Sequence, residues 1–233
     1  KILIGDQGVK ILSDSSVIVF GVGGVGSFAV EALARGGVGK IVLVDHDRIC
    51  PTNLNRQLPA LHSTLGLEKV SVLKNRIKDI NPLCQVEIIQ KYYEEGNKEE
   101  FFQESYDYVI DAIDSIKSKV DLIDQALSLK LNIISAAGAG NRLDPTSFRV
   151  ADISKTFGCP LAKILRRELR KRGIVNGFKV VFSPNAINTE QRSPVGSISF
   201  MPPIAGMILA GVVINELLEK NQKTSKKQLI KSN

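Results

Sequence analysis

A chain of 233 residues is long enough for one large domain with a buried core, and 43% apolar and 24% charged residues are typical of a globular protein. Three widely spaced cysteines, Cys50, Cys84 and Cys159, exclude a disulfide framework and a four-cysteine zinc site, and favour a reducing cytoplasm. Residues 151–233 carry 14 Lys or Arg and 5 Asp or Glu, whereas residues 1–150 carry 17 and 19, so the last third is predicted to bind a polyanion.

Alternating strands and helices are predicted over the first 136 residues. Apolar periodicity gives helices at 24–35, 67–80 and 118–129, between strands at 17–20, 41–45, 86–89, 108–111 and 133–136. This order indicates an α/β, Rossmann-like fold, a mostly parallel sheet with helices on both faces and ligands beyond the carboxyl ends of the strands. Asp45, Asp111 and Asp114 lie at or just after such ends, so we expect all three carboxylates at one edge of the sheet.

The pattern changes after Gly140, and a smaller α+β carboxyl-terminal extension is predicted. We expect a nucleotide-binding core over residues 1–145, an extension of the same domain over 146–220 and a basic, disordered or weakly helical tail over 221–233. The extension has an extended segment at 148–153, a helix at 160–172, a strand at 179–182 and an irregular stretch at 183–197. Residues 201–214 are apolar but shorter than the roughly 20 residues of a spanning helix, so we expect a buried or interface helix and no membrane span.

A glycine-rich turn follows the first strand. Because glycine has no Cβ, the backbone N–H groups of such a turn can approach phosphate oxygens, and the turn contains Gly21, Gly23, Gly24 and Gly26. Followed by a second strand that ends in Asp45, this turn fits NAD as well as ATP.

Later polar residues favour ATP. Asn53, Arg56, Lys69 and Asp114 supply cations and a metal-binding carboxylate, which nucleotidyl transfer needs and hydride transfer does not. Three of these four have a simpler explanation by themselves: Asn53 as a turn former, Lys69 as a surface charge and Asp114 as a helix cap. Their joint order after a nucleotide loop favours an ATP site.

The helix at 160–172 is predicted to have one apolar and one cationic face. The cations recur at i, i+3, i+4 and i+7, and are Lys163, Arg166, Arg167 and Arg170. A solvated surface explains such a stripe as well as a phosphate-backbone contact does.

Three longer strings carry a resemblance to a known family. They are Asp111-Ala112-Ile113-Asp114-Ser115, the segment 138–145 and the segment 152–162. With them the chain resembles, over nearly its whole length, the ThiF/MoeB/HesA superfamily, which is related to ubiquitin-activating enzymes. Within that superfamily the strings are similar to the branch of tRNA threonylcarbamoyladenosine dehydratases.

The resemblance implies roles for individual residues. The four glycines hold the ATP phosphates, Asp45 binds the ribose, and Asp47 also contacts the nucleotide. Asn53, Arg56 and Lys69 hold the triphosphate, Arg56 and Lys69 offset its charge during catalysis, and Asp114 coordinates Mg²⁺ as the metal ligand and a catalytic residue. The Arg that relatives usually carry in an amino-terminal helix, which reaches the partner subunit's ATP site, has no counterpart in residues 1–8.

The implied activity is that of a homodimeric, ATP- and Mg²⁺-dependent enzyme. It would adenylate the threonine carboxylate of threonylcarbamoyladenosine in tRNA, after which an internal nitrogen displaces AMP and closes a ring. Residues 146–220 would then serve tRNA binding and dimerisation, and a sulfur-relay or sulfur-acceptor protein remains open as a partner. The alternatives are adenylation of the carboxyl terminus of a ubiquitin-like sulfur carrier, a non-catalytic tRNA- or partner-binding module and, least favoured, an NAD-dependent oxidoreductase.

Overall fold

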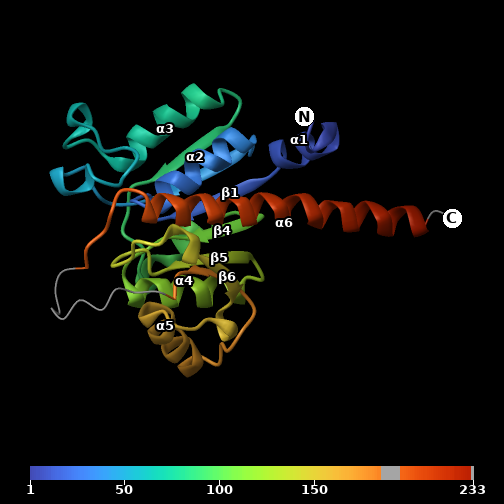
Figure 1. The fold of residues 1–233 in the computed structure, drawn as a ribbon. Coiled ribbons are helices and arrows are strands. Elements are labelled where there is room, and N and C mark those ends of the chain that lie inside the picture. Colours follow the sequence, from blue (N-terminus) through green and yellow to red (C-terminus); the bar gives the residue numbers. More distant parts are fainter. Residues whose placement is uncertain (185–194, 232–233) are drawn as a thin grey trace.

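The computed structural model describes residues 1–184 and 195–231, with side chains up to residue 219. Within this part of the chain, seven strands form one sheet in the order β3-β2-β1-β4-β5-β7-β6 (Figure 1). The sheet is parallel except for β6, which pairs antiparallel with β7. The strands are β1 Ser16–Phe20, β2 Lys40–Val44, β3 Gln85–Ile89, β4 Tyr108–Asp111, β5 Asn132–Ala137, β6 Arg149–Asp152 and β7 Lys179–Phe182.

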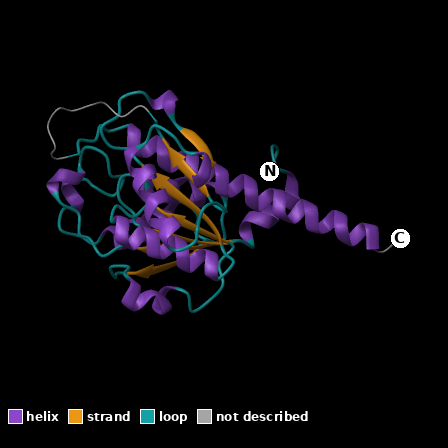
Figure 2. Ribbon diagram, turned by 90° about the horizontal axis from the view of Figure 1, so that it is seen from below, coloured by secondary structure: helices purple, strands orange, loops and turns teal. Residues whose placement is uncertain are grey.

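Helices cover both faces of the sheet, as expected (Figure 2). One face carries α1 Gly5–Ser13, α2 Gly26–Gly36, α3 Lys69–Ile80 and α6 Met201–Lys231, and the other carries α4 Ile116–Ser128 and α5 Pro160–Lys171. Successive side chains of β1 enter opposite layers, because Val17 and Val19 pack with the first group and Ile18 and Phe20 with the second. Short 3₁₀ helices lie at Pro51–Asn53, His62–Thr64, Glu95–Phe101, Pro145–Ser147 and Ile153–Lys155.

The last helix differs from its prediction. It has 31 residues, and its segment Met201–Glu219 is long and apolar enough to span a membrane by length and composition, so the argument from a short helix was wrong. Packing identifies it as a core helix instead, since Ala205, Leu209 and Val213 are fully or almost fully buried in the layer that contains α2. A Cβ at Gly206 would lie 2.2 Å from the Val25 carbonyl oxygen, so only glycine permits this approach of the two helices.

Two predictions concern residues that the structure describes incompletely. The tail predicted from 221 onward continues α6 as far as Lys231, and residues 232–233 lie outside the described part. Residues 185–194 of the stretch predicted to be irregular also lie outside it. The strands β7 and β6 extend the same sheet that the first 137 residues begin.

Candidate nucleotide-binding and active site

A cavity of about 430 Å³ opens at the carboxyl ends of β1, β2 and β4. The structure brings nine of the ten predicted nucleotide, catalytic and metal residues to its wall, and only Gly26 of that set does not line it. Those nine are Gly21, Gly23, Gly24, Asp45, Asp47, Asn53, Arg56, Lys69 and Asp114.

The glycine turn is fixed by contacts between backbone atoms. Gly21 has a φ of +81°, and a Cβ there would lie 2.7 Å from the Ala112 carbonyl oxygen. A Cβ at Gly26 would lie 1.8 Å from the Gly21 carbonyl oxygen. For Gly26 the structure therefore gives a steric role inside the turn, where we had expected contact with phosphate.

Asp45 ties this turn to the end of β2. Its Oδ2 accepts a hydrogen bond of 2.8 Å from the Val22 N–H, and its Oδ1 accepts one of 2.9 Å from the Asp47 N–H. Each carboxylate oxygen keeps capacity for a further hydrogen bond. The ribose contact of Asp45 stays a prediction.

Lys69 is not a surface charge. The residue is 4% exposed, and its Nζ donates to Asp47 Oδ2 over 2.6 Å, while the Asp47 side chain is 48% exposed. The Asp47 carbonyl also accepts a 3.2 Å hydrogen bond from the Lys69 N–H at the start of α3, so two contacts fix the lysine. An ammonium group has three N–H donors, and one carboxylate contact leaves donors for phosphate oxygens.

The 3₁₀ turn after β2 supplies Asn53 and Arg56. Asn53 Oδ1 accepts a 3.1 Å hydrogen bond from the Cys50 N–H, so Asn53 does stabilise a turn while it lines the cavity. Arg56 Nη1 donates to the Thr52 carbonyl at 2.8 Å and to Asn55 Oδ1 at 2.9 Å, which holds its side chain beside the glycine turn.

Gln57 is a cavity residue to which we had given no role. It is 8% exposed and its side chain lies under Gly23, where a Cβ would be 3.6 Å from Gln57 Nε2. Its Oε1 is buried with no hydrogen-bond partner among the described residues. An orphaned buried acceptor in a ligand cavity indicates a donor supplied by a ligand or by water. Its position directly after Arg56 in the sequence was the one feature that could have indicated that Gln57 lines the cavity.

The exposed Cys50 lies at the start of the same turn. Its Sγ is 3.0 Å from Thr52 Oγ1, and this contact lowers the pKa of the thiol, with smaller contributions from the Thr52 backbone and the charge of Lys69. Buried Cys84 shows the opposite direction, because burial raises its pKa.

Asp114 is exposed at the cavity wall, and its carboxylate makes no hydrogen bond or ion pair within the described residues. The helix-cap explanation is wrong for it, because Ser115 caps α4 by accepting from the Ser118 N–H at 3.4 Å. A carboxylate on the cavity wall with no partner among the described residues is available to a cation.

Asp111 contradicts the expectation of three carboxylates at the edge of the sheet. It is 0% exposed, and its Oδ2 accepts from Lys119 Nζ at 2.7 Å and from Ser135 Oγ at 2.6 Å. The carboxylate at the end of β4 therefore points into the protein and forms a sealed ion pair.

The cationic face of α5 is only partly free. Lys163 and Arg170 are exposed, whereas Arg167 pairs with Glu168 at 2.8 Å. Arg166 turns back and donates to the Thr156 carbonyl at 2.7 Å. The tRNA contact of these four cations stays a prediction.

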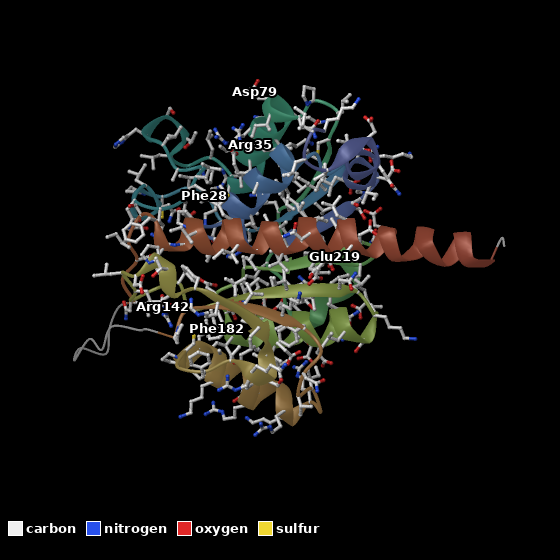
Figure 3. All side chains as sticks on the ribbon, turned by 45° about the vertical axis from the view of Figure 1, so that its right-hand side comes forward. Phe28, Arg35, Asp79, Arg142, Phe182 and Glu219 are labelled. Atoms are coloured by element: carbon white, nitrogen blue, oxygen red, sulfur yellow. The ribbon has the colours of Figure 1, made fainter. Side chains whose placement is uncertain are left out.

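A second cavity, of about 790 Å³, adjoins the first and shares part of its wall, including Val25, Ile113, Asp114 and Gly140. Most of its wall is apolar. Arg142 is the cation in it, and lies with Phe182 on one side of α6 in Figure 3, while Arg35 and Asp79 lie on the other side.

Comparison with known proteins gives the family. The model of the ThiF family matches residues 1–233. The chain belongs to this family. It is similar to the tRNA threonylcarbamoyladenosine dehydratase of Bacillus subtilis, with 47% identity over 94% of this chain and 93% of that protein. A crystal structure of the Escherichia coli tRNA N6-threonylcarbamoyladenosine dehydratase in complex with ATP superposes with a TM-score of 0.89 at 35% identity, over 95% of this chain and 93% of that one.

Sulfur-carrier enzymes match less of the chain. An adenylyltransferase and sulfurtransferase of Aedes aegypti is 35% identical over 58% of this chain and 30% of that protein. The structural match to the dehydratase confirms the predicted α/β fold, in which β6, β7, α5 and α6 complete the sheet and its cover.

Proposed function

We propose that this chain is an ATP-dependent tRNA threonylcarbamoyladenosine dehydratase. The carrying observation is the convergence of Lys69, Arg56 and Asp114 on one cavity above the glycine turn, in a chain nearly half identical to the Bacillus subtilis dehydratase. The sulfur-carrier alternative is less favoured, because its relatives match little more than half of the chain.

The reaction has two steps. A carboxylate oxygen of the substrate forms a bond to the α-phosphorus of ATP, and the bond from that phosphorus to the departing pyrophosphate breaks. A nitrogen within the same threonylcarbamoyl arm then attacks the activated carbonyl carbon, AMP leaves, and the nitrogen loses a proton. The nucleophile of the second step belongs to the substrate, so no enzyme cysteine is required.

In the first step the attacking carboxylate and the ATP phosphates are both negatively charged, and the cations of the protein reduce the repulsion between them. Lys69 is buried and held by Asp47, so it needs no reorganisation to meet the phosphates. Arg56, tied to Thr52 and Asn55 and packed beside Gly24, keeps further N–H donors for the phosphates.

Mg²⁺ fits the residues present. Asp114 has a carboxylate on the cavity wall with no partner among the described residues, and Mg²⁺ in such sites is held by one or two carboxylates together with substrate phosphates. The cluster of Asp45, His46 and Asp47 fits less well, because Asp45 binds backbone N–H groups and Asp47 pairs with Lys69. When bound, the ion would offset negative charge on the phosphates.

The partners follow from the same proposal. The exposed cations of α5 contact the tRNA backbone, the enzyme is a homodimer, and the reaction occurs in the cytoplasm. A sulfur-relay partner is not needed for the two steps and stays an open part of the prediction.

The test is to incubate the protein with ATP, Mg²⁺ and tRNA that carries threonylcarbamoyladenosine, and to measure by mass spectrometry a nucleoside lighter by one water. Asp114→Asn should reduce the initial rate by about 100-fold or more, as expected for loss of a group that stabilises transition-state charge. Its thermal stability should not change, because the Asp114 carboxylate makes no hydrogen bond or ion pair with the described residues. The matched control is Asp79→Asn, on the exposed end of α3 (Figure 3), which should keep full activity. Rapid AMP formation on a sulfur-carrier protein, with unchanged tRNA, would support the alternative.

A further inference from the structure

Among the described residues, the wall of the second cavity contains no ion pair like that of Lys69 with Asp47 in the first. Its wall comes from the ends of β4, β5 and β7 with the loops that follow them, from the residue before β6 and from the starts of α4, α5 and α6. Its side chains include Ile116, Phe148, Leu161 and Val181. Its volume, about 790 Å³, is in the range that encloses most of a small ligand. Asp114, Ile113 and Gly140 line both cavities, so a group in the second cavity is beside the nucleotide.

Arg142 stands out among the buried charges. Six charged residues of the described chain are buried, and five have an opposite charge in contact: Glu31 with Arg76, Lys69 with Asp47, Asp111 with Lys119, and Asp121 with Arg172. Arg142 is 6% exposed and has no carboxylate partner among the residues that the structure describes. Burial lowers the pKa of its guanidinium, yet a guanidinium keeps its charge in proteins.

The contacts of Arg142 orient it without neutralising it. Nε donates to the Ser183 carbonyl at 3.0 Å, Nη2 to Cys159 Sγ at 3.4 Å, and Nη1 to the Gly140 carbonyl. These acceptors are two carbonyls and a thiol sulfur, and they use three of the five N–H donors. Arg142 is therefore a rigidly held cation with unused donors beside an apolar cavity, an arrangement that favours an anionic, planar acceptor.

We propose that the second cavity receives the threonylcarbamoyl arm of the substrate, and that Arg142 binds its carboxylate before adenylation. This inference rests on the proposed function and assigns a positioning residue to it. One carboxylate oxygen contacts the guanidinium. The other oxygen stays free to attack the α-phosphorus of a nucleotide in the first cavity, at the boundary where the two cavities adjoin. The threonine methyl group contacts the apolar wall.

The test compares wild type with Arg142→Gln and Arg142→Lys, and measures KM for modified tRNA and for ATP separately. In Arg142→Gln we expect KM for the tRNA to rise by roughly 10- to 100-fold, the range for loss of a hydrogen bond to a charged group, with KM for ATP changed by less than about twofold. In Arg142→Lys we expect a smaller rise in KM for the tRNA, because an ammonium group keeps the positive charge but cannot reproduce the two parallel hydrogen bonds of a guanidinium.

A second readout separates carboxylate binding from a structural role. The free nucleoside threonylcarbamoyladenosine and its carboxamide are compared as inhibitors. Wild type should prefer the carboxylate form by roughly tenfold or more, and Arg142→Gln should lose most of this preference. Arg48→Gln is the control, because Arg48 also donates to a carbonyl but lies outside both cavities and outside residues 146–220, and both its KM values should be unchanged.

A second variant tests the same cavity without changing Arg142, in case Arg142→Gln fails to fold. Leu161→Glu places a carboxylate at the cavity wall on the first turn of α5, where a negative charge is tolerated by the helix, and should also raise KM for the tRNA selectively. Unchanged KM values and inhibitor preference in folded Arg142→Gln, or an unchanged KM in Leu161→Glu, would overturn the inference. Either result with a wild type that still makes the cyclic product leaves the proposed function intact, whereas a wild type that makes none contradicts that function instead.

Discussion

The two cavities at the carboxyl edge of the sheet are built in different ways. In the nucleotide cavity the buried charge is compensated by the protein, since Lys69 meets Asp47, and the glycine turn is held by Asp45. In the second cavity Arg142 meets neutral acceptors. The first cavity is therefore organised before any ligand enters, and the second leaves one charge for a ligand to neutralise. This difference fits the two proposed roles, in which the first cavity activates the phosphates of ATP and the second binds the carboxylate that attacks them.

The largest effects should come from the two buried lysines, which separate stability from activity. Lys119→Met leaves the Asp111 carboxylate at 0% exposure without its ion pair, and should lower the free energy of unfolding by about 3–5 kcal/mol in urea denaturation. Lys69→Met leaves Asp47 half in water, so it should cost clearly less stability but should reduce adenylation by about 100-fold.

A compensating variant sharpens this comparison. Replacing the whole buried cluster, as Lys119→Met with Asp111→Leu and Ser135→Ala, should restore most of the lost stability, because an apolar cluster of similar volume is usually neutral or better than a buried ion pair and leaves no unpaired Ser135 hydroxyl. Equal destabilisation in Lys69→Met and Lys119→Met, with adenylation intact in both, would contradict the distinction between a functional and a structural lysine.

A large effect is also expected from the glycine turn. In Gly26→Ala the new Cβ would lie 1.8 Å from the Gly21 carbonyl oxygen. That oxygen belongs to the backbone, and the backbone also fixes the position of the Cβ, so neither atom can rotate away and the turn must open. Displacement of about 1 Å in a positioning element can reduce a rate by about 100-fold, and we expect that loss in ATP–pyrophosphate exchange.

Gly211→Ala is the matched control for Gly26→Ala. Gly211 lies inside α6 with no atom within 4 Å of the added Cβ, so the change should stabilise the protein by up to about 1 kcal/mol and leave exchange unchanged. Near-normal exchange in Gly26→Ala would show that the turn adapts and that its geometry does not limit the reaction.

The same contrast explains what the sequence could predict. The nucleotide cavity is assembled from short motifs at strand ends, and parallel strands bring such ends together whatever the details of packing, so the edge of the sheet that carries Asn53, Arg56, Lys69 and Asp114 was predictable. The alternation of strands and helices along the chain, and from it the mostly parallel sheet covered by helices on both faces, followed from apolar periodicity, whereas the order of the strands within the sheet was not predicted.

Side-chain direction and long-range contacts were not predictable. Asp111 and Asp114 are three positions apart, yet one is sealed and the other exposed, which depends on Lys119 and Ser135 from other elements. Arg142 is fixed by Ser183, 41 positions away, and by Cys159, 17 positions away. No local pattern encodes such contacts. The length of α6 was misjudged because the apolar stripe ends before the helix does.

The smallest effect is expected on α5, where the comparison concerns free and tethered cations. Lys163→Ala and Arg170→Ala should each raise KM for tRNA by a few-fold and reduce the slope of log affinity against log salt by about 1, since each removes one phosphate contact. Arg166→Ala should leave the slope nearly unchanged, because its guanidinium is bound to the Thr156 carbonyl and does not reach solvent freely. Lys74→Ala on α3, across the sheet from α5 (Figure 1), controls for net charge. Equal changes of slope in all four variants would show that tRNA responds to the total charge of the protein, and α5 would then have no special part in binding.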